Sequence, residues 1–132
     1  MCMIDGADGY NAFSRDETRK ARKEHRCVEC RRMIQPGETY HYLVALFDGD
    51  LSSDHCCQHC YVACEWLREV CSGWIVGSVL EDIEEHVREY MGTARLARLA
   101  IAMRRNWKYK RGPRAGQLMP VPAIPPKLQL GH

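Results

Sequence analysis

Two pairs of cysteines, each with the spacing Cys-x-x-Cys, constrain the fold of this chain more than any other feature. Cys27 and Cys30 form the first pair, Cys57 and Cys60 form the second, and 26 residues lie between the pairs. Two thiolates at this spacing can bind one metal ion from a single turn, and two such turns complete the four-sulfur tetrahedral shell of a structural zinc site. The sequence therefore predicts one structural Zn²⁺ ion bound by these four cysteines.

Several neighbouring side chains could replace a ligand in the second pair, namely Cys56, His55, His59 and Cys64. The spacing favours Cys57 with Cys60, because two cysteines at the N-terminus of a helix direct both sulfur atoms toward one point. A Zn²⁺ ion with four thiolates has a net charge of −2, and nearby cationic groups are expected to offset it. The candidates for this role are Arg26, Arg31, Arg32, His55 and His59. Cys64 and Cys71 are expected to be small core residues.

The cysteine content is compatible with a disulfide framework or with metal thiolates, and other features favour the metal. Eight cysteines occur in 132 residues. Residues 1–8 have neither the basic nor the apolar region of a signal peptide. No run approaches the ~18–20 apolar residues that span a bilayer. We therefore expect a cytoplasmic protein that makes no membrane contact and binds zinc.

The expected secondary structure is a small α+β arrangement. A strand over 39–47 is followed by the hairpin signal Asp48-Gly49 and a return strand over 50–53. Apolar residues recur with helical spacing in three later segments. The predicted helices cover 18–24, after the capping box Ser14–Glu17, then 61–71, 79–91 and 93–108. Prolines beyond Gly112 predict an extended tail.

This order of elements predicts a treble-clef-like module, in which a cysteine knuckle, a β-hairpin and a helix surround the zinc ion. Two further helices and the Pro-rich tail follow it. We expect a flexible N-terminus over 1–13, a zinc-binding domain with an acidic helix over 14–92, and a basic helix with the tail over 93–132.

Charge is distributed unevenly along the chain. Residues 1–92 contain all 17 acidic residues and have a net charge of −7, whereas residues 93–132 have a net charge of +9. A basic segment of this kind commonly contacts an anionic surface, most often nucleic acid. The alternative is that the two halves neutralise each other within the fold or within a homo-oligomer.

The basic segment over 104–114 combines cations with aromatic rings, which can pair with phosphates and stack on bases. The candidate binding residues are Arg104, Arg105, Lys108, Tyr109, Lys110, Arg111 and Arg114. Trp107 continues the apolar stripe of the preceding helix, so a role as a core anchor is favoured over base stacking. The same cations could instead bind the acidic helix or an acidic protein.

A closed four-cysteine shell has no position for a reactive water, so the zinc site predicts a non-enzymatic protein. No motif for a small-molecule substrate is evident. The enzymatic alternative is a nuclease of the HNH type. Nucleases of this type have an Asp-His pair, and Asp54-His55 resembles it. That group also needs an asparagine and a second histidine on the following helix, and residues 61–72 contain neither.

The chain resembles small zinc-binding proteins encoded by bacteriophages and prophages. The resemblance covers about residues 18–125 and rests on the basic run before Cys27, both Cys-x-x-Cys pairs, Ile34-x-x-Gly37-Glu38-x-Tyr40, Asp48-Gly49, Cys71-Ser72-Gly73-Trp74, Glu81-Asp82 and His86. It implies a protein made in the bacterial cytoplasm during infection, with Cys27, Cys30, Cys57 and Cys60 as metal ligands. It also implies an accessory role in which the protein binds a host protein or nucleic acid, as in host takeover or anti-defence.

Overall fold

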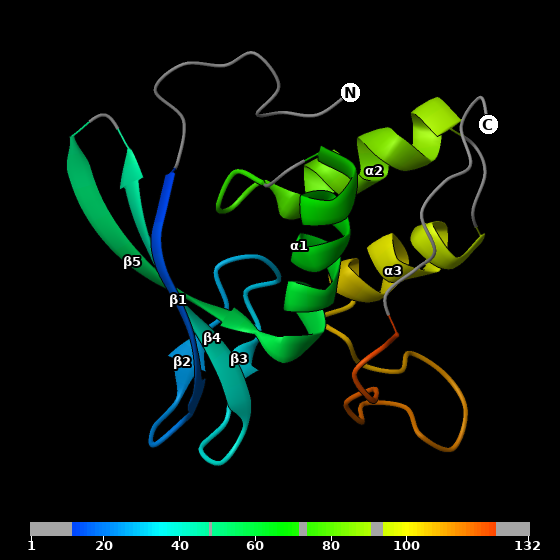
Figure 1. The fold of residues 1–132 in the computed structure, drawn as a ribbon. Coiled ribbons are helices and arrows are strands. Elements are labelled where there is room, and N and C mark those ends of the chain that lie inside the picture. The colour runs from blue at the N-terminus through cyan, green and yellow to red at the C-terminus, as the bar shows by residue number, and fades with distance from the viewer. Residues whose placement is uncertain (1–11, 48, 72–73, 91–93, 124–132) are drawn as a thin grey trace.

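A computed structural model describes residues 12–47, 49–71, 74–90 and 94–123. It confirms a small α+β fold with antiparallel sheets and three helices in this part of the chain (Figure 1). The strands are β1 (Ala12–Lys20), β2 (His25–Arg26), β3 (Met33–Ile34), β4 (Thr39–Phe47) and β5 (Asp50–Cys57). The helices are α1 (Gln58–Cys71), α2 (Val79–Tyr90) and α3 (Ala94–Arg104).

The larger sheet has three antiparallel strands in the order β1-β4-β5. The predicted hairpin joins β4 to β5, and Phe47 pairs with Asp50 across its turn. Gly49 has a φ of +84°, a left-handed value that glycine adopts at little cost. The other turn residue, Asp48, lies outside the described residues. β5 is longer than predicted and ends at Cys57, so the strand itself delivers a cysteine to the candidate metal site.

The helix predicted over 18–24 is wrong, because residues 12–20 form strand β1. β1 pairs with β4 along its length, from Ala12 opposite Leu46 to Lys20 opposite Thr39. Ala21 is the one apolar residue in the predicted helix. A helix there would bury almost nothing, and most helical stability in proteins comes from a buried apolar face. Pairing with β4 instead satisfies the backbone of this polar segment.

Helix α1 lies between the sheet and the other two helices (Figure 1). It begins at Gln58, three residues before the predicted start, and nine of its 14 residues are buried. Its neighbour α2 begins at Val79, as predicted, and packs against α3. The predicted end of α2 at Met91 lies outside the described residues. The core formed in this way includes Trp66, Trp74 and Trp107, none of which is more than 1% exposed.

Helix α3 ends at Arg104, four residues before the predicted Lys108. Asn106 and Trp107 have φ values of 55° and 61°, which turn the chain sharply out of the helix. Trp107 is buried as predicted. It does not continue the apolar stripe of the helix, however; the left-handed turn after the helix places it in the core.

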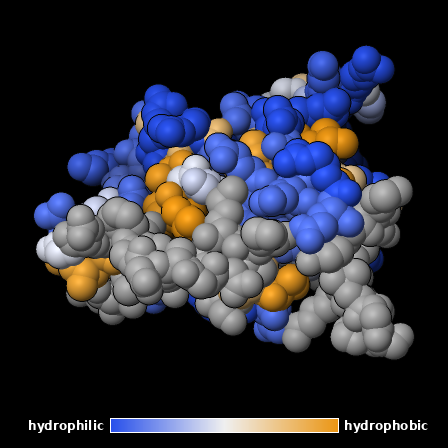
Figure 2. Space-filling model, turned by 90° about the horizontal axis from the view of Figure 1, so that it is seen from above, coloured by the Kyte–Doolittle hydropathy of each residue, from blue (hydrophilic) through white to orange (hydrophobic). Residues whose placement is uncertain are grey.

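The segment after Trp107 turns back on the domain. Lys108 forms a β-bridge with Leu118, and the Met119 N–H donates to the Trp107 carbonyl at 2.7 Å. Residues 120–123 continue without helix or strand, and the rest of the predicted tail lies outside the described residues. Most of the described surface in Figure 2 is hydrophilic, with apolar residues in small areas. Within the described ranges, no helix combines the length and apolar character needed to cross a membrane.

Candidate metal centre

Two short backbone structures present the four predicted cysteine ligands. Cys27 and Cys30 lie in the turn between β2 and β3, where the Cys27 N–H donates to the Arg32 carbonyl at 2.8 Å. Arg31 closes this turn with a φ of 68°. Cys57 is the last residue of β5, and Cys60 lies in the first turn of α1. The site therefore joins the small hairpin, the large sheet and the central helix.

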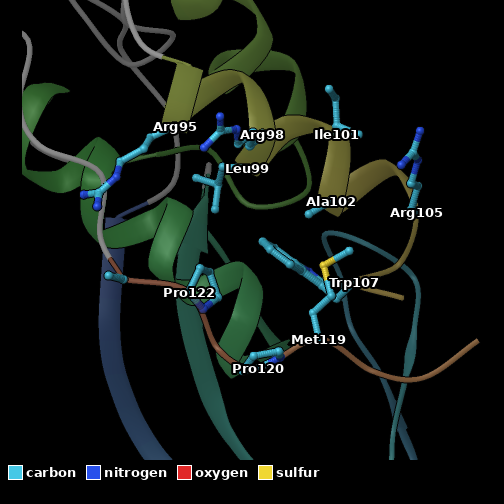
Figure 3. Close-up of a pocket in the computed structure, with 11 residues that line it drawn as sticks. Arg95, Arg98, Leu99, Ile101, Ala102, Arg105, Trp107, Met119, Pro120 and Pro122 are labelled. Atoms are coloured by element: carbon cyan, nitrogen blue, oxygen red, sulfur yellow. The ribbon is translucent and has the colours of Figure 1, made fainter. Parts of the chain in front are cut away.

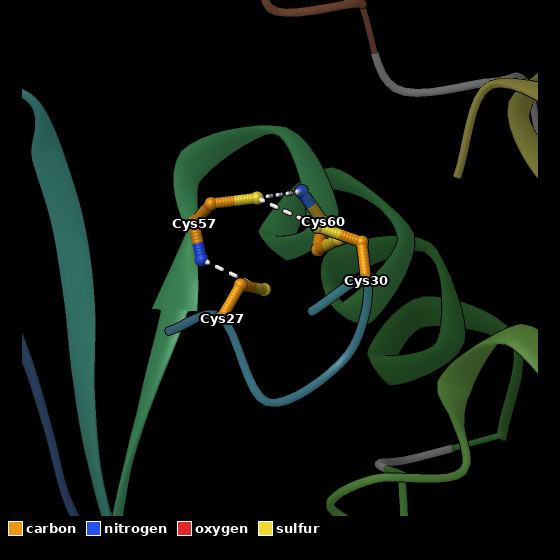
Figure 4. A group of neighbouring side chains, drawn as sticks. All are labelled: Cys27, Cys30, Cys57 and Cys60. Carbon is orange, nitrogen blue, oxygen red and sulfur yellow. Dashed lines mark hydrogen bonds between the residues drawn. The ribbon is translucent and has the colours of Figure 1, made fainter. Parts of the chain in front are cut away.

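The four sulfur atoms converge on one point (Figure 4). All of them lie within 4.8 Å of one another, and the Cys30 and Cys57 sulfurs are 3.9 Å apart. Sulfurs at the corners of a tetrahedron around Zn²⁺, with bonds of about 2.3 Å, are separated by about 3.8 Å. All four cysteines are buried, Cys30 being the most exposed at 7%. This arrangement could hold a metal ion.

Three N–H groups point at these sulfurs. The Cys57 N–H donates to Cys27 Sγ at 3.3 Å, and the Cys60 N–H donates to Cys57 Sγ at 3.4 Å. The indole N–H of Trp107 donates to Cys60 Sγ at 3.1 Å. Donors of this kind, together with the positive end of the α1 dipole, stabilise thiolates over thiols. The contact with Cys27 nevertheless raises the pKa of Cys57, and burial raises the pKa of Cys60, so these two thiols would deprotonate only with a cation bound between the sulfurs.

Among the predicted cationic neighbours, Arg32 has the closest link to the site. Its side chain is only 5% exposed and forms two 3.0 Å hydrogen bonds to the Glu38 carboxylate. Burial opposes its charge, but Glu38 and Cys57 together hold the pKa of Arg32 above its ordinary value. Arg26 instead donates to the Arg31 carbonyl at 2.8 Å, which stabilises the turn.

The alternative ligands lie outside the four-sulfur cluster. His59 Nε2 donates to the Met119 carbonyl at 2.6 Å, and His55 stacks on the ring of His25. The Cys56 thiol donates to the Cys57 carbonyl at 3.5 Å. Contact with Cys27 raises the pKa of Cys56, and burial raises the pKa of Cys64, so both favour the neutral thiol. Cys64 and Cys71 are buried as predicted.

Glu29, inside the first cysteine turn, has a structural role that the sequence did not reveal. Its carboxylate accepts hydrogen bonds from the Gly77 N–H at 2.8 Å and the Val79 N–H at 3.1 Å. Glu29 thereby caps the N-terminus of α2 from outside the helix. Burial raises the pKa of Glu29 to about 7, although these two hydrogen bonds act to lower it. Partners 48 and 50 residues away leave no local signal in the sequence.

His55, considered above for a nuclease site, and His86, the later histidine of α2, lie in different surroundings. His86 is fully buried in α2, where its Nδ1–H donates to the Asp82 carbonyl at 2.7 Å and Nε2 lies 3.3 Å from Cys71 Sγ. Burial opposes its charge, but the Asp82 contacts outweigh burial and raise the pKa of His86. His55 lies on β5, stacked on His25 with ring centres 4.1 Å apart.

The predicted basic segment over 104–114 is mostly free of acidic partners. Arg104 forms an ion pair with Glu84 of α2, as expected if the segment docked on the acidic helix. The other cations are exposed and have no carboxylate partner among the described residues, and these are Arg105, Lys108, Lys110, Arg111 and Arg114. Tyr109 is half-buried and accepts a hydrogen bond from Arg114 at 3.4 Å.

An open groove of about 590 Å³ lies between α3 and residues 119–123 (Figure 3). Leu99 and Ala102 on α3 face Pro120 and Pro122, while Arg95 and Arg105 lie at opposite ends. Arg98, Ile101, Trp107, Met119 and Ala123 complete the lining. An apolar floor with cationic ends suits an amphipathic, acidic ligand.

Comparisons with protein-family models, with curated proteins and with solved structures find no match to this chain.

Proposed function

We propose that this protein is a non-enzymatic, zinc-stabilised, treble-clef-like module that binds nucleic acid through its basic C-terminal segment. The observation that carries the proposal is the attachment of this segment to the four-cysteine cluster. Trp107 donates a hydrogen bond to Cys60 Sγ, and unpaired cations lie on both sides of it, at Arg105 and from Lys108 onward. A metal site would thus hold a cationic loop in a defined position.

Three features support zinc as the metal and the treble clef as the arrangement. Four buried cysteines whose sulfur atoms lie within 4.8 Å of one another are typical of structural Zn²⁺ sites. The chain order is a cysteine turn, a β-hairpin and a helix whose first turn contributes the last ligand. Four protein ligands also leave no open coordination position, so the ion would serve the fold and not a reaction.

Nucleic acid is supported as the partner by the charges that the fold leaves unpaired. Arg104 is already paired with Glu84, so it would bind a phosphate only weakly. Lys110, Arg111 and Arg114 are exposed without a described carboxylate partner. Each phosphate contact by such a group releases counterions, which makes binding depend strongly on salt.

Replacing Lys110, Arg111 and Arg114 together by alanine is expected to weaken nucleic-acid binding about 100-fold near 0.1 M salt. The slope of log affinity against log salt should become shallower by roughly 2 to 3, because about 0.7–0.9 is lost per phosphate contact. Fluorescence anisotropy with labelled oligonucleotides at several salt concentrations measures both quantities. The conservative variant Lys110→Arg should bind like the wild type. If the wild-type protein binds no DNA or RNA even at low salt, the proposal fails.

The groove in Figure 3 favours a second candidate partner, an acidic segment of a host protein with apolar residues between its charges. A short labelled peptide of glutamate and leucine should then bind the wild type. Its affinity for the double variant Arg95→Ala/Arg98→Ala should be roughly tenfold lower, because charged hydrogen bonds would be lost. The triple variant of Lys110, Arg111 and Arg114 is the matched control and should retain the peptide. Equal binding by all three proteins would reject this candidate.

A further inference from the structure

We propose that the nucleic-acid surface is longer than the C-terminal segment, and that one phosphodiester backbone lies along a continuous cationic track across the lower end of the domain in Figure 1. The track joins three parts, which are residues 19–25, residues 31–38 and residues 106–118. This inference rests on the proposed function and extends it to residues far from the C-terminal segment in sequence.

The first part is an open hollow at the end of β1, of about 1030 Å³. None of the described residues that line it is acidic; they are Arg19, Lys20, Ala21, Arg22, Lys23, His25 and Tyr40. Arg19 is paired with Glu17 and lies over the Tyr42 ring at 3.9 Å. Lys20, Arg22 and Lys23 are exposed and have no carboxylate partner among the described residues. They therefore supply three free cations at one place.

Aromatic rings form one side of this hollow. His25 stacks on His55 with an angle of 16° between the ring planes, and Tyr40 lies 5.1 Å from His25 between ring centres. Tyr40 is only 5% exposed, so the partly exposed ring of His25 is the one that a base could reach beside these cations. Tyr109 gives the C-terminal segment a comparable ring next to Arg114.

Backbone hydrogen bonds connect the hollow to the second part. The Ala21 N–H donates to the Glu38 carbonyl, and the Gly37 N–H donates to the Ala21 carbonyl, both at 2.8 Å. Arg31, Arg32, Gln35 and Glu38 then line a second hollow of about 540 Å³. Glu38 is already neutralised by its two bonds to Arg32, so it interrupts the track little.

The same second hollow contains the beginning of the C-terminal segment. Asn106, Lys108, Gly116 and Leu118 line it opposite Arg31. The second and third stretches, which are distant in sequence, thus line one hollow. In Figure 1 the loop after β1, the loop after β3 and the loop after α3 lie toward the lower end, while the turn between β2 and β3 lies higher. Cations occur in each stretch, from Lys20 to Arg31 to Lys110.

The chemistry of the track fits a polyanion better than a protein. Protein interfaces have an apolar centre, and among the exposed large hydrophobic residues in the described part of the chain only Leu118 lies on the track. A single small anion would occupy one hollow and leave the other cations unused. Regularly repeated phosphates can pair with cations in all three parts at once.

The test compares two triple variants, Lys20→Ala/Arg22→Ala/Lys23→Ala in the hollow and Lys110→Ala/Arg111→Ala/Arg114→Ala in the C-terminal segment. Affinity for labelled oligo-dT, oligo-rU and a DNA duplex is measured against salt. For the oligonucleotide that binds most tightly, each triple variant should bind with about 100-fold lower affinity than the wild type near 0.1 M salt. The slope of log affinity against log salt should become shallower by roughly 2 to 3 in each variant. Which oligonucleotide binds most tightly identifies the form of nucleic acid.

Controls separate charge from folding. Lys20→Arg/Lys23→Arg keeps both charges and should bind like the wild type, and each variant should keep the wild-type thermal midpoint because the side chains are exposed. Loss of binding by the C-terminal triple alone would overturn the track and leave the proposed function intact. Failure of the wild type to bind any of the three oligonucleotides would overturn both. If polyglutamate binds as tightly as the oligonucleotides and both triple variants weaken its binding, the assignment to phosphodiesters is overturned.

Discussion

Replacing Cys27 or Cys60 by serine is expected to abolish cooperative unfolding of the domain. The sulfurs of these residues belong to a buried cluster that joins the small hairpin, the sheet and helix α1. Structural Zn²⁺ contributes about 10–16 kcal/mol in small zinc domains. A whole domain is stable by only about 5–15 kcal/mol. Loss of the ion therefore removes as much free energy as the folded state has in total.

The measurement is thermal unfolding followed by circular dichroism, together with the zinc content of each purified variant. Cys64→Ala is the matched control, because Cys64 is also a fully buried thiol of α1 but lies outside the cluster. It should keep the metal and a cooperative transition. A Cys27→Ser protein that unfolds at the wild-type temperature would show that the cluster is not a metal site essential to the fold.

Replacing Trp107 by alanine is expected to destabilise the protein by about 3–5 kcal/mol, the usual cost of truncating a buried tryptophan. The indole is 1% exposed, and its N–H donates to Cys60 Sγ at 3.1 Å. Its backbone carbonyl, which alanine retains, accepts a hydrogen bond from the Met119 N–H. The loss of the indole should therefore destabilise the core, and it should affect the basic loop only because the side-chain bond to Cys60 is lost.

Trp107→Phe separates these contributions, because phenylalanine keeps much of the buried ring and removes the N–H donor. Its expected cost is about 1.5–3 kcal/mol, the range for a hydrogen bond to a charged group. Tyr109→Ala, a half-buried aromatic two residues later, is the control and should cost less than either. Urea unfolding of the four proteins measures the free energies. A cost of Trp107→Ala no larger than that of Tyr109→Ala would contradict the role of Trp107 as anchor.

Features with a short sequence signature were predictable. The two Cys-x-x-Cys pairs, the hairpin at Gly49 and the periodic apolar residues of α1 and α2 each express their structure within a few residues. The four cysteines converge as their spacing predicted. Element ends were less predictable: α3 stops four residues before the predicted end because two left-handed residues turn Trp107 into the core.

Features that depend on distant partners were not predictable. Residues 14–17 match a helix cap, yet β4 provides a better partner for the polar segment that follows, and β1 forms instead. The same change brings Lys20, Arg22 and Lys23 to one hollow at the end of β1. Glu29 caps a helix about 50 residues away, and nothing local to it indicates this role.

Native mass spectrometry of the wild-type protein tests whether the four cysteines bind a structural metal, because it counts metal ions in the folded chain. We expect one zinc ion per chain, lost together with the fold on chelation and absent from Cys27→Ser and Cys60→Ser but retained by Cys64→Ala. A metal-free chain that unfolds cooperatively, at a temperature unchanged by chelator, would contradict it.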